Sequence, residues 1–545
     1  MARIGAVTPS GRGRRLALMF AAVVAALWAA GSAAADSAGT GGDVSVAQTL
    51  GDRELTVVLR RVTSVPGPLR VDIVTHAGVS AGRLELAVTP VGASAAAVTP
   101  APGVATAHTA VDLGGAPGMV SATVAVDRAG PWELAVDDGA RIARIPFIVP
   151  AQVTSPPERL VYWGFLAAGV LLPVTVLVAV RARRTAWAML PGAGMVAGVS
   201  VAVTAAVLSA GLPLPPQPGP QLDPSVDNVT HPYALGRPLT ADYSRPPVLL
   251  TVLGDPPAAG APGDLRLALA DAATGAPVDD LVVHDAALIH LLIVGPGGEL
   301  WHLHPIRTGP GRYEVRLTPP QPGRYAVSAE LERRGGGIRM VRAATGLLVP
   351  GPATPAAAPG STGPEVAGTP PILGGPTRTA HVAVAGGPVT ITITDATAGT
   401  PITVTATVGD TPDLQPWLGM VGHMILAGPL AADTDLGAAV QQAPIWGHAH
   451  SMGGSATASD GMDMPGMDHS KPAVSPMVPS NGNAMLMAPA NGESGPDETV
   501  AAYGPDVPFT FVFPVAGRYR VWIQVERHWS VLTVPFVLDV ARGRP

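Results

Sequence analysis

The stretch LVYWGFLAAGVLLPVTVLVAV, residues Leu160–Val180, contains no charged residue and is long enough to cross a bilayer of about 30 Å as a helix. A short basic turn, Arg181–Arg184, follows it, and a second uncharged run covers Thr185–Leu212. This second run is rich in Gly, Ala and Ser, the small residues through which membrane helices approach each other closely. The alternative is a buried hairpin of a soluble protein, but neither helix has the polar face that such a helix normally shows. The sequence therefore predicts a two-helix transmembrane hairpin at 160–212.

The charges near this hairpin predict its orientation. Three arginines in the short turn Arg181–Arg184 should stay cytoplasmic by the positive-inside rule, which places both large flanking regions on the other side. At the N-terminus, arginines precede the apolar run Leu16–Ala30, and Ala33–Ala35 supplies a small-residue cleavage signal. This pattern is typical of a secretory signal peptide, here residues 1–35, and an uncleaved signal would keep the same orientation. We expect a protein of the cell membrane, in contact with the lipid bilayer, whose large domains are all extracytoplasmic.

The composition narrows the classes of protein that the chain can belong to. Its 545 residues include 65 Gly and 59 Pro with only 14% charged residues, which favours short strands, turns and linkers over long soluble helices. A net charge of -6 argues against nucleic acid as a partner. Without cysteine there is neither a disulfide nor a thiolate metal ligand. Phosphate loops, nucleophile elbows and zinc-protease motifs are also absent from the sequence, so we expect no enzyme, although a redox-active copper centre stays open.

Residues 41–150 form the first predicted domain. Short runs in which apolar and polar residues alternate, separated by Gly and Pro turns, predict a small antiparallel β-sandwich. Its two histidines, His76 and His108, are isolated, and we expect both on the surface. A Pro-rich linker follows the hairpin at 213–247, and a second Pro/Gly/Ala linker covers 350–377.

The two remaining regions, 248–349 and 378–542, are copies of each other. Asp280, His290 and Gly295 recur as Asp413, His423 and Gly428 at a constant offset of 133 residues. Further along, a Gly-Arg-Tyr turn leads into a late strand in each copy, at residues 323–325 and 517–519. Both copies should be Ig-like sandwiches. The fold class is therefore predicted as mainly β, with three Ig-like antiparallel β-sandwich domains and a two-helix transmembrane hairpin.

In the first copy the histidines lie on a predicted hairpin. His290 lies in the apolar run Ala286–Val294, and a turn at Gly295–Gly298 leads to a return strand with His302 and His304. Residues i and i+2 of a strand face the same way, so His302 and His304 project together, with His290 on the neighbouring strand. Three imidazoles so placed predict a site for Cu(II), Zn(II) or Ni(II). Two further candidate ligands are nearby: His284 and Glu299.

The second copy repeats this plan with His423, His448 and His450, which predicts a second metal site. The same constellation in both copies is stronger evidence than one His-x-His motif. The alternative is a structural cluster in which the histidines hydrogen-bond the hairpin.

The second copy also carries an insertion at about 451–504 that the first copy lacks. The segment is rich in Gly, Ser, Asp and Pro and has no apolar periodicity, so it should form no packed core. Thioether sulfur suits Cu(I), and Met-x-Met with nearby His is a recurrent way of holding that ion. The alternative is a low-complexity segment whose methionines have no role. The candidate Cu(I) ligands are Met452, Met462, Met464, Met467 and His469.

The stretches LQPWLGMVGH at Leu414–His423 and WHLHP at Trp301–Pro305 resemble bacterial exported proteins with duplicated, His-x-His-bearing sandwich domains of the YtkA-like or heavy-metal-binding type. The resemblance covers about 248–542 and implies exported metal-binding domains. In architecture and composition the chain is also similar to copper-resistance proteins of the CopC type. Those proteins use a histidine at the mature N-terminus, where this chain would have Asp36. The family's His-x-His-Pro pattern is present in the first copy, whereas Ser451 follows His450 in the second.

The sequence predicts a membrane-anchored, extracytoplasmic protein that binds or buffers copper, with Cu(II) at the histidine sites and Cu(I) at the insertion. Zinc is the other candidate metal. A second hypothesis is a cell-surface structural or protein-interaction module without metal. A third is the delivery of copper to a membrane oxidase. The sequence names no protein partner.

Overall fold

The computed structural model describes the chain over residues 43–60, 62, 64–76, 80–91, 104–149, 156–182, 184–209, 246–333, 337–351, 369–385, 387–431, 435–451 and 497–543. The predicted signal peptide, nearly all of the first linker and most of the second linker lie outside these residues, as do residues 452–496 of the insertion. The chain divides into two compact units, and the helical hairpin belongs to one of them. All sandwich domains belong to the other unit.

The helical unit contains the predicted hairpin. Helix α2 covers Pro156–Arg181, the short 3-10 helix η1 covers Thr185–Ala188, and helix α3 covers Met189–Ser209. Both long helices are apolar and long enough to cross a membrane, and most of their large side chains are exposed within the unit. Exposed apolar side chains on paired helices are what contact with lipid requires. Helix α2 begins four residues before the expected apolar run, with Pro156 at a position where proline is well tolerated.

Small residues bring the two helices together. A Cβ atom on Gly164 would lie 2.6 Å from the carbonyl oxygen of Gly198, and one on Gly198 would lie 2.8 Å from the carbonyl oxygen of Gly164. Ala202 and Ala168, one turn further along each helix, are buried in the same contact. The Gly and Ala content that predicted close helix packing is therefore used at this contact.

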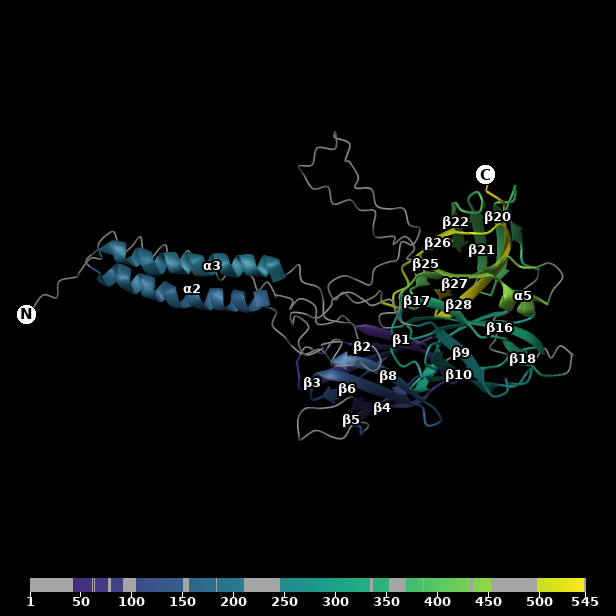
Figure 1. Cartoon of the computed structure of the whole chain (residues 1–545), viewed down its shortest axis with the longest axis horizontal. Coiled ribbons are helices and arrows are strands. Elements are labelled where there is room, and N and C mark those ends of the chain that lie inside the picture. Colours follow the sequence, from purple (N-terminus) through teal and green to yellow (C-terminus); the bar gives the residue numbers. More distant parts are fainter. Residues whose placement is uncertain are drawn as a thin grey trace, which may run out of the picture. The chain divides into compact units, whose positions relative to one another are not determined.

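The first sandwich consists of two four-stranded antiparallel sheets, with strand orders β1-β2-β3-β6 and β5-β4-β7-β8 (Figure 1). Apolar side chains of alternating residues meet between the sheets, as the period of two predicted. The strands are β1 (Val44–Leu50), β2 (Arg53–Leu59), β3 (Gly67–Thr75), β4 (Gly82–Pro90), β5 (Ala107–Leu113), β6 (Gly118–Val126), β7 (Gly130–Asp137) and β8 (Ile142–Val149).

The first repeat pairs the sheet β14-β15-β10-β9 with the sheet β11-β16-β12-β13, in which β17 and β18 also pair with β16. Its first and last strands coincide with the predicted bounds of the domain. The strands are β9 (Val248–Leu253), β10 (Gly263–Asp271), β11 (Leu281–Val282), β12 (His290–Val294), β13 (Leu300–Leu303), β14 (Ile306–Gly309), β15 (Arg312–Leu317), β16 (Gly323–Arg333), β17 (Gly337–Arg342) and β18 (Leu347–Val349).

The second repeat pairs the sheet β20-β21-β22-β26 with the sheet β19-β28-β27-β24-β25, in which β23 pairs with β27. A short helix, α5 (Leu436–Gln442), lies between the hairpin strands β24 and β25. The strands are β19 (Ile372–Leu373), β20 (Thr379–Val384), β21 (Gly387–Ile393), β22 (Pro401–Val408), β23 (Leu414–Gln415), β24 (Gly422–Gly428), β25 (Ile445–Ser451), β26 (Asp506–Val512), β27 (Gly517–Arg527) and β28 (Ser530–Val540).

Two boundaries of the second repeat differ from the sequence prediction. Strand β19 pairs in parallel with β28 and buries Leu373, so the sandwich begins before residue 378. The end of the expected insertion also belongs to the sandwich, because Tyr503 forms a β-bridge with Leu414 and Glu498 is buried. Both differences have one cause: pairing with a distant strand cannot be predicted for a short segment that lies among Pro, Gly and polar residues.

The two repeats pack back to back through their hairpin strands β12 and β24, every residue of which is buried. Leu291 and Ile293 of β12 point into the core of their own sandwich. Leu292 and Ile425 point the other way, into a separate apolar cluster shared by both repeats. A strand with apolar residues on both faces needs a layer on each side, and the second repeat supplies that layer for the first.

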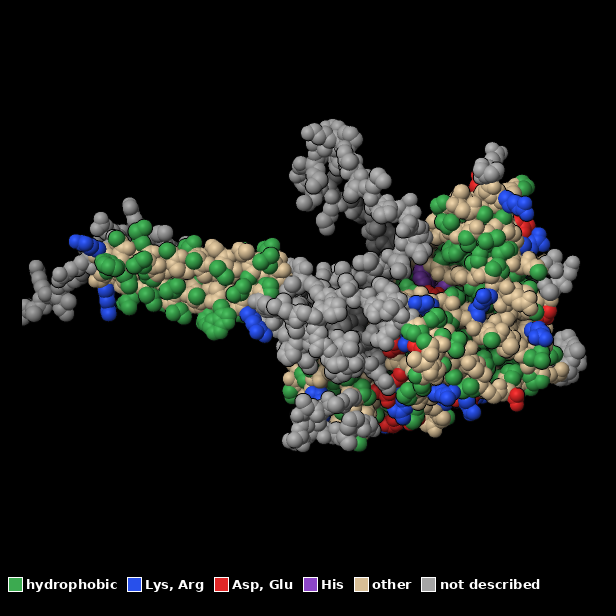
Figure 2. Space-filling model, in the orientation of Figure 1, with side chains coloured by type: hydrophobic (Ala, Val, Ile, Leu, Met, Phe, Trp, Pro, Cys, Tyr) green, Lys and Arg blue, Asp and Glu red, His purple; other side chains and the backbone are tan. Residues whose placement is uncertain are grey.

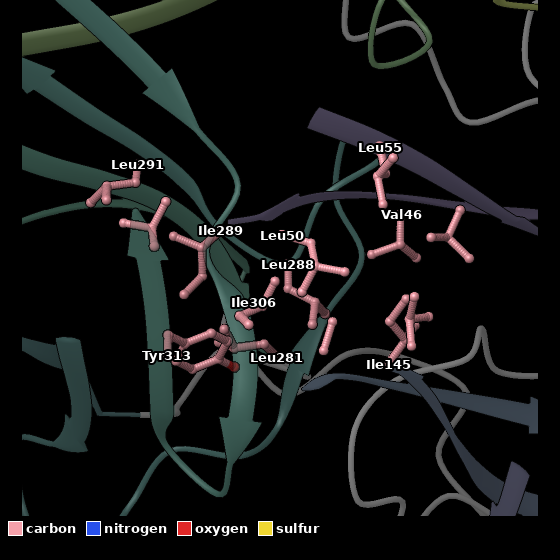
Figure 3. Packing of buried hydrophobic residues seen from close by; sticks show 14 of the residues in the cluster. Val46, Leu50, Leu55, Ile145, Leu281, Leu288, Ile289, Leu291, Ile306 and Tyr313 are labelled. Atoms are coloured by element: carbon pink, nitrogen blue, oxygen red, sulfur yellow. The ribbon is translucent and has the colours of Figure 1, made fainter. Parts of the chain in front are cut away.

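The first sandwich shares a continuous apolar core with the first repeat (Figure 3). Leu50 and Ile145 come from the first sandwich, and Leu288 and Ile306 come from the repeat. Ion pairs surround this core: Arg141 binds Asp264 at 2.7 Å and Arg307 binds Glu133 at 2.8 Å. Apolar burial and cross-domain ion pairs thus join these two domains.

Trp522 provides a test of the contact between the repeats. Its ring is fully buried in the shared apolar cluster, and its Nε1 donates a hydrogen bond to the carbonyl oxygen of Gly298 at 2.9 Å. Trp522→Ala should lower the free energy of unfolding by about 3–5 kcal/mol, because it leaves a cavity. Trp522→Phe should cost about 1–2 kcal/mol, because most of the volume stays and one hydrogen bond is lost. Urea unfolding of the full chain in detergent measures both, and equal stability of all three proteins would contradict the packing.

Candidate metal centre

The six predicted histidines of the two repeats lie together between the two sheets that contain the hairpins, β11-β16-β12-β13 and β19-β28-β27-β24-β25. Strand β24 places His423 directly opposite His450, and it places Ile425 opposite His448, in the antiparallel register with β25. Five of the six side chains are nearly or fully buried, and Figure 2 shows only a small patch of histidine surface beside acidic side chains. The hairpin prediction is therefore confirmed in its geometry. The two separate sites that it implied form one cluster instead.

Each repeat holds a histidine of the other repeat in place. His302 of the first repeat has its Nδ1 3.0 Å from Oε1 of Gln524, and His448 of the second repeat has its Nδ1 2.8 Å from Oε2 of Glu330. Glu330 and Gln524 occupy equivalent positions on the late strands β16 and β27. The cluster is therefore built with approximate two-fold symmetry, and neither repeat completes it alone.

In the second repeat ring nitrogens of three histidines converge. His423 donates through Nε2 to the carbonyl oxygen of Trp417 at 3.0 Å, which leaves its Nδ1 without a proton. His448 donates through Nδ1 to Glu330, and Nδ1 of His450 is 3.3 Å from a carboxylate oxygen of Asp285. Nε2 of His448 then lies 3.1 Å from Nδ1 of His423 and 3.2 Å from Nε2 of His450. The three ligand atoms lie within 4.8 Å of one another.

The first repeat has two such nitrogens and takes its third from the second repeat. His290 donates through Nε2 to the carbonyl oxygen of His284, and its Nδ1 lies 3.0 Å from Nε2 of His302. His448 completes this group within 4.8 Å. His304, the expected third ligand, donates instead to Glu54 of the first sandwich through Nδ1 at 2.5 Å. The Nε2 atom of His304 is buried and has no hydrogen-bond partner.

Burial disfavours the protonated form of four histidines of the cluster: His290, His302, His423 and His450. It lowers the pKa of His290, His302 and His423 well below 6.5, and the neighbouring histidines lower each pKa further. Burial, together with repulsion from His448, also lowers the pKa of His450 to about 4. A neutral imidazole with one nitrogen engaged as a donor offers the other nitrogen as a metal ligand.

A third group of possible ligands adjoins the cluster. Nε2 of His284 lies 2.7 Å from Asp285 and 3.5 Å from Glu330, and the ligand atoms of the three residues lie within 4.8 Å of one another. Burial disfavours the charge on His284, but its hydrogen bonds to Asp285 and Glu330 and the attraction of both carboxylates together outweigh burial and raise its pKa to about 10. His284 was expected as an extra ligand, whereas Asp285 and Glu330 were missed because an isolated carboxylate in sequence does not show which histidine it will contact.

The surface prediction for His76 is wrong. Its side chain is buried, with Nδ1 2.6 Å from Oε1 of Glu526 and Nε2 3.3 Å from the hydroxyl oxygen of Thr56. Burial opposes its charge, but the hydrogen bond to Glu526 and the attraction of the Glu526, Glu498 and Glu54 carboxylates together outweigh burial and raise the pKa of His76 to about 9. Its partner is 450 residues away in sequence, so no local pattern could have identified the pair. His108 is exposed, as expected.

The predicted Cu(I) ligands lie outside the described residues: Met452, Met462, Met464, Met467 and His469. The other extra candidate, Glu299, accepts a backbone hydrogen bond from Gly297 and another from the side chain of Gln321. It belongs to the hairpin turn and to none of the three ligand groups.

No protein-family model and no curated protein matches this chain. Solved structures give matches of low score. The adhesin FdeC of Escherichia coli is 12% identical, with 88% of this chain and 93% of that chain covered and a TM-score of 0.13. Invasin, a bacterial integrin-binding protein, is 7% identical over 92% of this chain and 59% of its own, with a TM-score of 0.13. The D00-D0 domain of intimin is 14% identical over 53% and 98% of the two chains, with a TM-score of 0.11. At these scores the similarities carry no argument about function, and none of these three descriptions mentions copper.

The His76–Glu526 pair predicts a dependence of stability on alkaline pH. Because the folded pKa of His76 is raised from 6.5 to about 9, its stabilising contribution is complete below pH 6.5 and is lost as the pH rises to about 9. His76→Gln should remove on the order of 2 kcal/mol of the stability difference between these two pH values. Urea unfolding of the full chain across this range measures it, with exposed His108→Gln as the control. An unchanged slope in His76→Gln would contradict the ion pair.

Proposed function

We propose that this protein is a membrane-anchored metal-binding protein whose paired repeats hold a copper ion between them. The observation that carries the proposal is the convergence of ring nitrogens of His423, His448 and His450 in a largely buried place. Each of the three rings also has its second nitrogen near a carbonyl or carboxylate oxygen. Metal-bound histidines in proteins characteristically make such contacts, which fix the ring orientation and the tautomer.

A cation between these rings would remove a repulsion between their nitrogen atoms. Two ring nitrogens 3.1 Å apart repel each other unless a proton or a metal ion lies between them. The pKa of His423 lies well below 6.5 because burial and the other histidines disfavour a proton there. A metal ion gains several ligands at once, and the carboxylates of Glu330 and Asp285 balance its charge. A bound metal ion therefore suits this group of nitrogens in the place that a shared proton would otherwise take.

The donor atoms favour copper. Imidazole nitrogen binds Zn(II), Ni(II) and Cu(II), and with a given set of nitrogen ligands Cu(II) binds most tightly of the three. Zinc remains the alternative, since three histidines suit it as well. Binding of Cu(I) by Met452, Met462, Met464, Met467 and His469 is a separate proposal that rests on the sequence alone.

The cluster should hold one tightly bound ion. Both three-nitrogen groups include His448, whose Nδ1 is engaged with Glu330, so only Nε2 is available to a metal. One lone pair serves one ion, so the groups cannot both be filled with His448 as a full ligand. The group in the second repeat has all three ligands on adjacent strands and is our choice for the tight site. The sequence had predicted one site in each repeat.

A second candidate is a cell-surface interaction module in which the histidines only join the domains. Within the structure, the extensive contact between three sandwiches favours it, because Glu54 and His76 link the first sandwich to both repeats. Metal content separates the two candidates, since the interaction module binds none. Delivery of copper to a membrane oxidase would follow from the first candidate if the bound ion exchanges with a partner.

The first test of the metal site is a Cu(II) titration of the full chain in detergent against a competing chelator. We expect one tight equivalent in the wild type. His448→Ala should weaken it by more than about 100-fold, because even the loss of a ligand's hydrogen-bond partner costs 10–100-fold. Glu330→Gln should weaken the affinity by only about 10–100-fold. His381→Ala, which removes an exposed histidine of the same repeat, is the matched control.

The titration should also depend on pH in a particular way. Ligand histidines must be neutral, and the pKa of His450 is lowered to about 4. The ligand His450 should therefore stay neutral well below pH 6.5, and its contribution to the affinity should be lost as the pH falls through about 4. An affinity that halves around pH 6.5, or a wild type without bound Cu(II), would contradict the site.

We also propose that the sandwich unit is extracytoplasmic, because the basic turn between the two apolar helices should remain in the cytoplasm. Reporter fusions placed after Pro150 and after Pro545 should both report export. A cytoplasmic signal from either fusion would contradict this topology, and it would leave the metal site itself untouched.

A further inference from the structure

The two repeats have the same loop backbone beside the histidine cluster but different side chains on it. Asp285 of the first repeat and Leu418 of the second occupy equivalent positions, and both have left-handed backbone conformations, with φ of 46° and 56°. The preceding residues are His284 and Trp417, whose carbonyl oxygens accept equivalent hydrogen bonds from His290 and His423. The scaffold is thus nearly symmetric, whereas the chemistry of the two loops is not.

On the side of the second repeat's loop the cluster is closed. Trp417 is only 3% exposed, and its ring centroid lies 5.1 Å from that of His423 and 5.2 Å from that of His302. Leu418 packs with Ala47 of the first sandwich, in a small apolar cluster that also contains Trp417. A hydrated ion has no polar group to bind on this apolar surface.

On the side of the first repeat's loop the cluster is bordered by polar, partly exposed groups. The side chains of His284 and Asp285 are each 14% exposed, and that of His450 is 18% exposed, whereas His448 beneath them is fully buried. Glu332 stands 3.8 Å from His284 and is 31% exposed. Exposure therefore decreases from Glu332 through His284 to the buried nitrogens of the cluster.

Two carboxylates connect this border to the three-histidine group. Asp285 contacts Nε2 of His284 at 2.7 Å and Nδ1 of His450 at 3.3 Å through the same oxygen. Glu330 uses Oε2 for His448 at 2.8 Å, and its Oε1 lies 3.5 Å from His284. The outer group of His284, Asp285 and Glu330 therefore touches two of the three ligands of the inner group directly.

We propose that His284, Asp285 and Glu330 form an outer site for divalent first-row cations, through which ions reach the inner group of His423, His448 and His450. This inference rests on the proposed metal-binding function. One imidazole and two carboxylates suit a cation that still carries water, whereas the inner group offers only imidazole nitrogens. The negative charge of the carboxylates raises the local concentration of cations at this border.

A metal ion at the outer site would take the place of the contacts that His284 now makes with Asp285 and Glu330. When the ion moves inward, Glu330 and Asp285 remain beside His448 and His450 and continue to balance its charge. The carboxylates thus serve both positions of the ion.

The test is the rate at which Cu(II) quenches the tryptophan fluorescence of the full chain in detergent, measured by stopped flow. Trp417 lies beside His423 and should report on filling of the inner group. His284→Gln removes a ligand of the outer site and leaves the contact between Asp285 and His450 in place. It should slow association by about tenfold, at the lower end of what electrostatic and positional effects on association reach, while the tight equivalent remains. Asp112→Asn, which removes an exposed carboxylate from the first sandwich, should leave the rate unchanged.

A second variant tests a carboxylate that contacts both the outer site and the inner group. Asp285→Asn should slow association and also weaken the tight site, because it perturbs the hydrogen-bond partner of His450 as well. Equal association rates in wild type, His284→Gln and Asp112→Asn, with the tight equivalent present in all three, would overturn the outer site alone. A wild type that binds no Cu(II) at equilibrium would overturn the proposed function first, so the two failures are distinguishable.

Discussion

The whole candidate site depends on one packing constraint, the burial of strands β12 and β24 on both faces. Each hairpin sheet uses one face for its own sandwich and the other for its sister repeat. His290 and His423 on these strands are buried, and each contacts a histidine of its return strand, His302 or His448. Gln524 and Glu330 then contact His302 and His448 across the junction, which makes the cluster a property of the pair of repeats. Separated repeats would expose an apolar surface and lose the orientation of His302 and His448 together.

The first sandwich also contributes contacts to the site, although no metal ligand was predicted from its own sequence. Glu54 binds His304 and, through its other carboxylate oxygen, the hydroxyl of Thr49 at 2.7 Å. His76 reaches Glu526 on the late strand of the second repeat. Buried polar groups are tolerated only where they are paired, so these contacts limit how far the three domains can move apart without leaving charges unpaired. The site is thereby held by three domains, with the apolar core of Leu50 and Leu288 fixing one junction and that of Leu292 and Ile425 fixing the other.

Sequence reasoning predicted what is local or periodic. Alternating runs gave the strands of the sandwiches, and the equal spacing of His290 and His423 gave equivalent hairpins with their histidines on one face. Contacts between domains were beyond its reach, because Glu54, Glu330 and His76 are single residues whose partners lie far away in sequence. One signal was present and informative: the continuous apolar run around His290 has no polar face, and a strand of this kind requires a second covering layer. Applied to both hairpins, it would have predicted that the repeats pack against each other.

Duplication of a domain gives two equivalent loops. The residues at equivalent positions of these loops indicate the role of each loop. If the histidines only braced the contact, either loop could be sealed with apolar side chains, as Trp417 and Leu418 seal one of them. The other loop carries His284 and Asp285 in the same backbone conformation, at the cost of placing a carboxylate and a second titratable ring beside a buried cluster. Even a paired carboxylate adds little to a purely structural junction, since the desolvation of two buried charges offsets their attraction. It benefits a site that exchanges a cation with solvent, because a cation needs a polar route on one side and an apolar barrier on the other to be both reachable and retained. The asymmetry of the two loops is therefore the structural feature that most directly supports the proposal of an ion between the repeats.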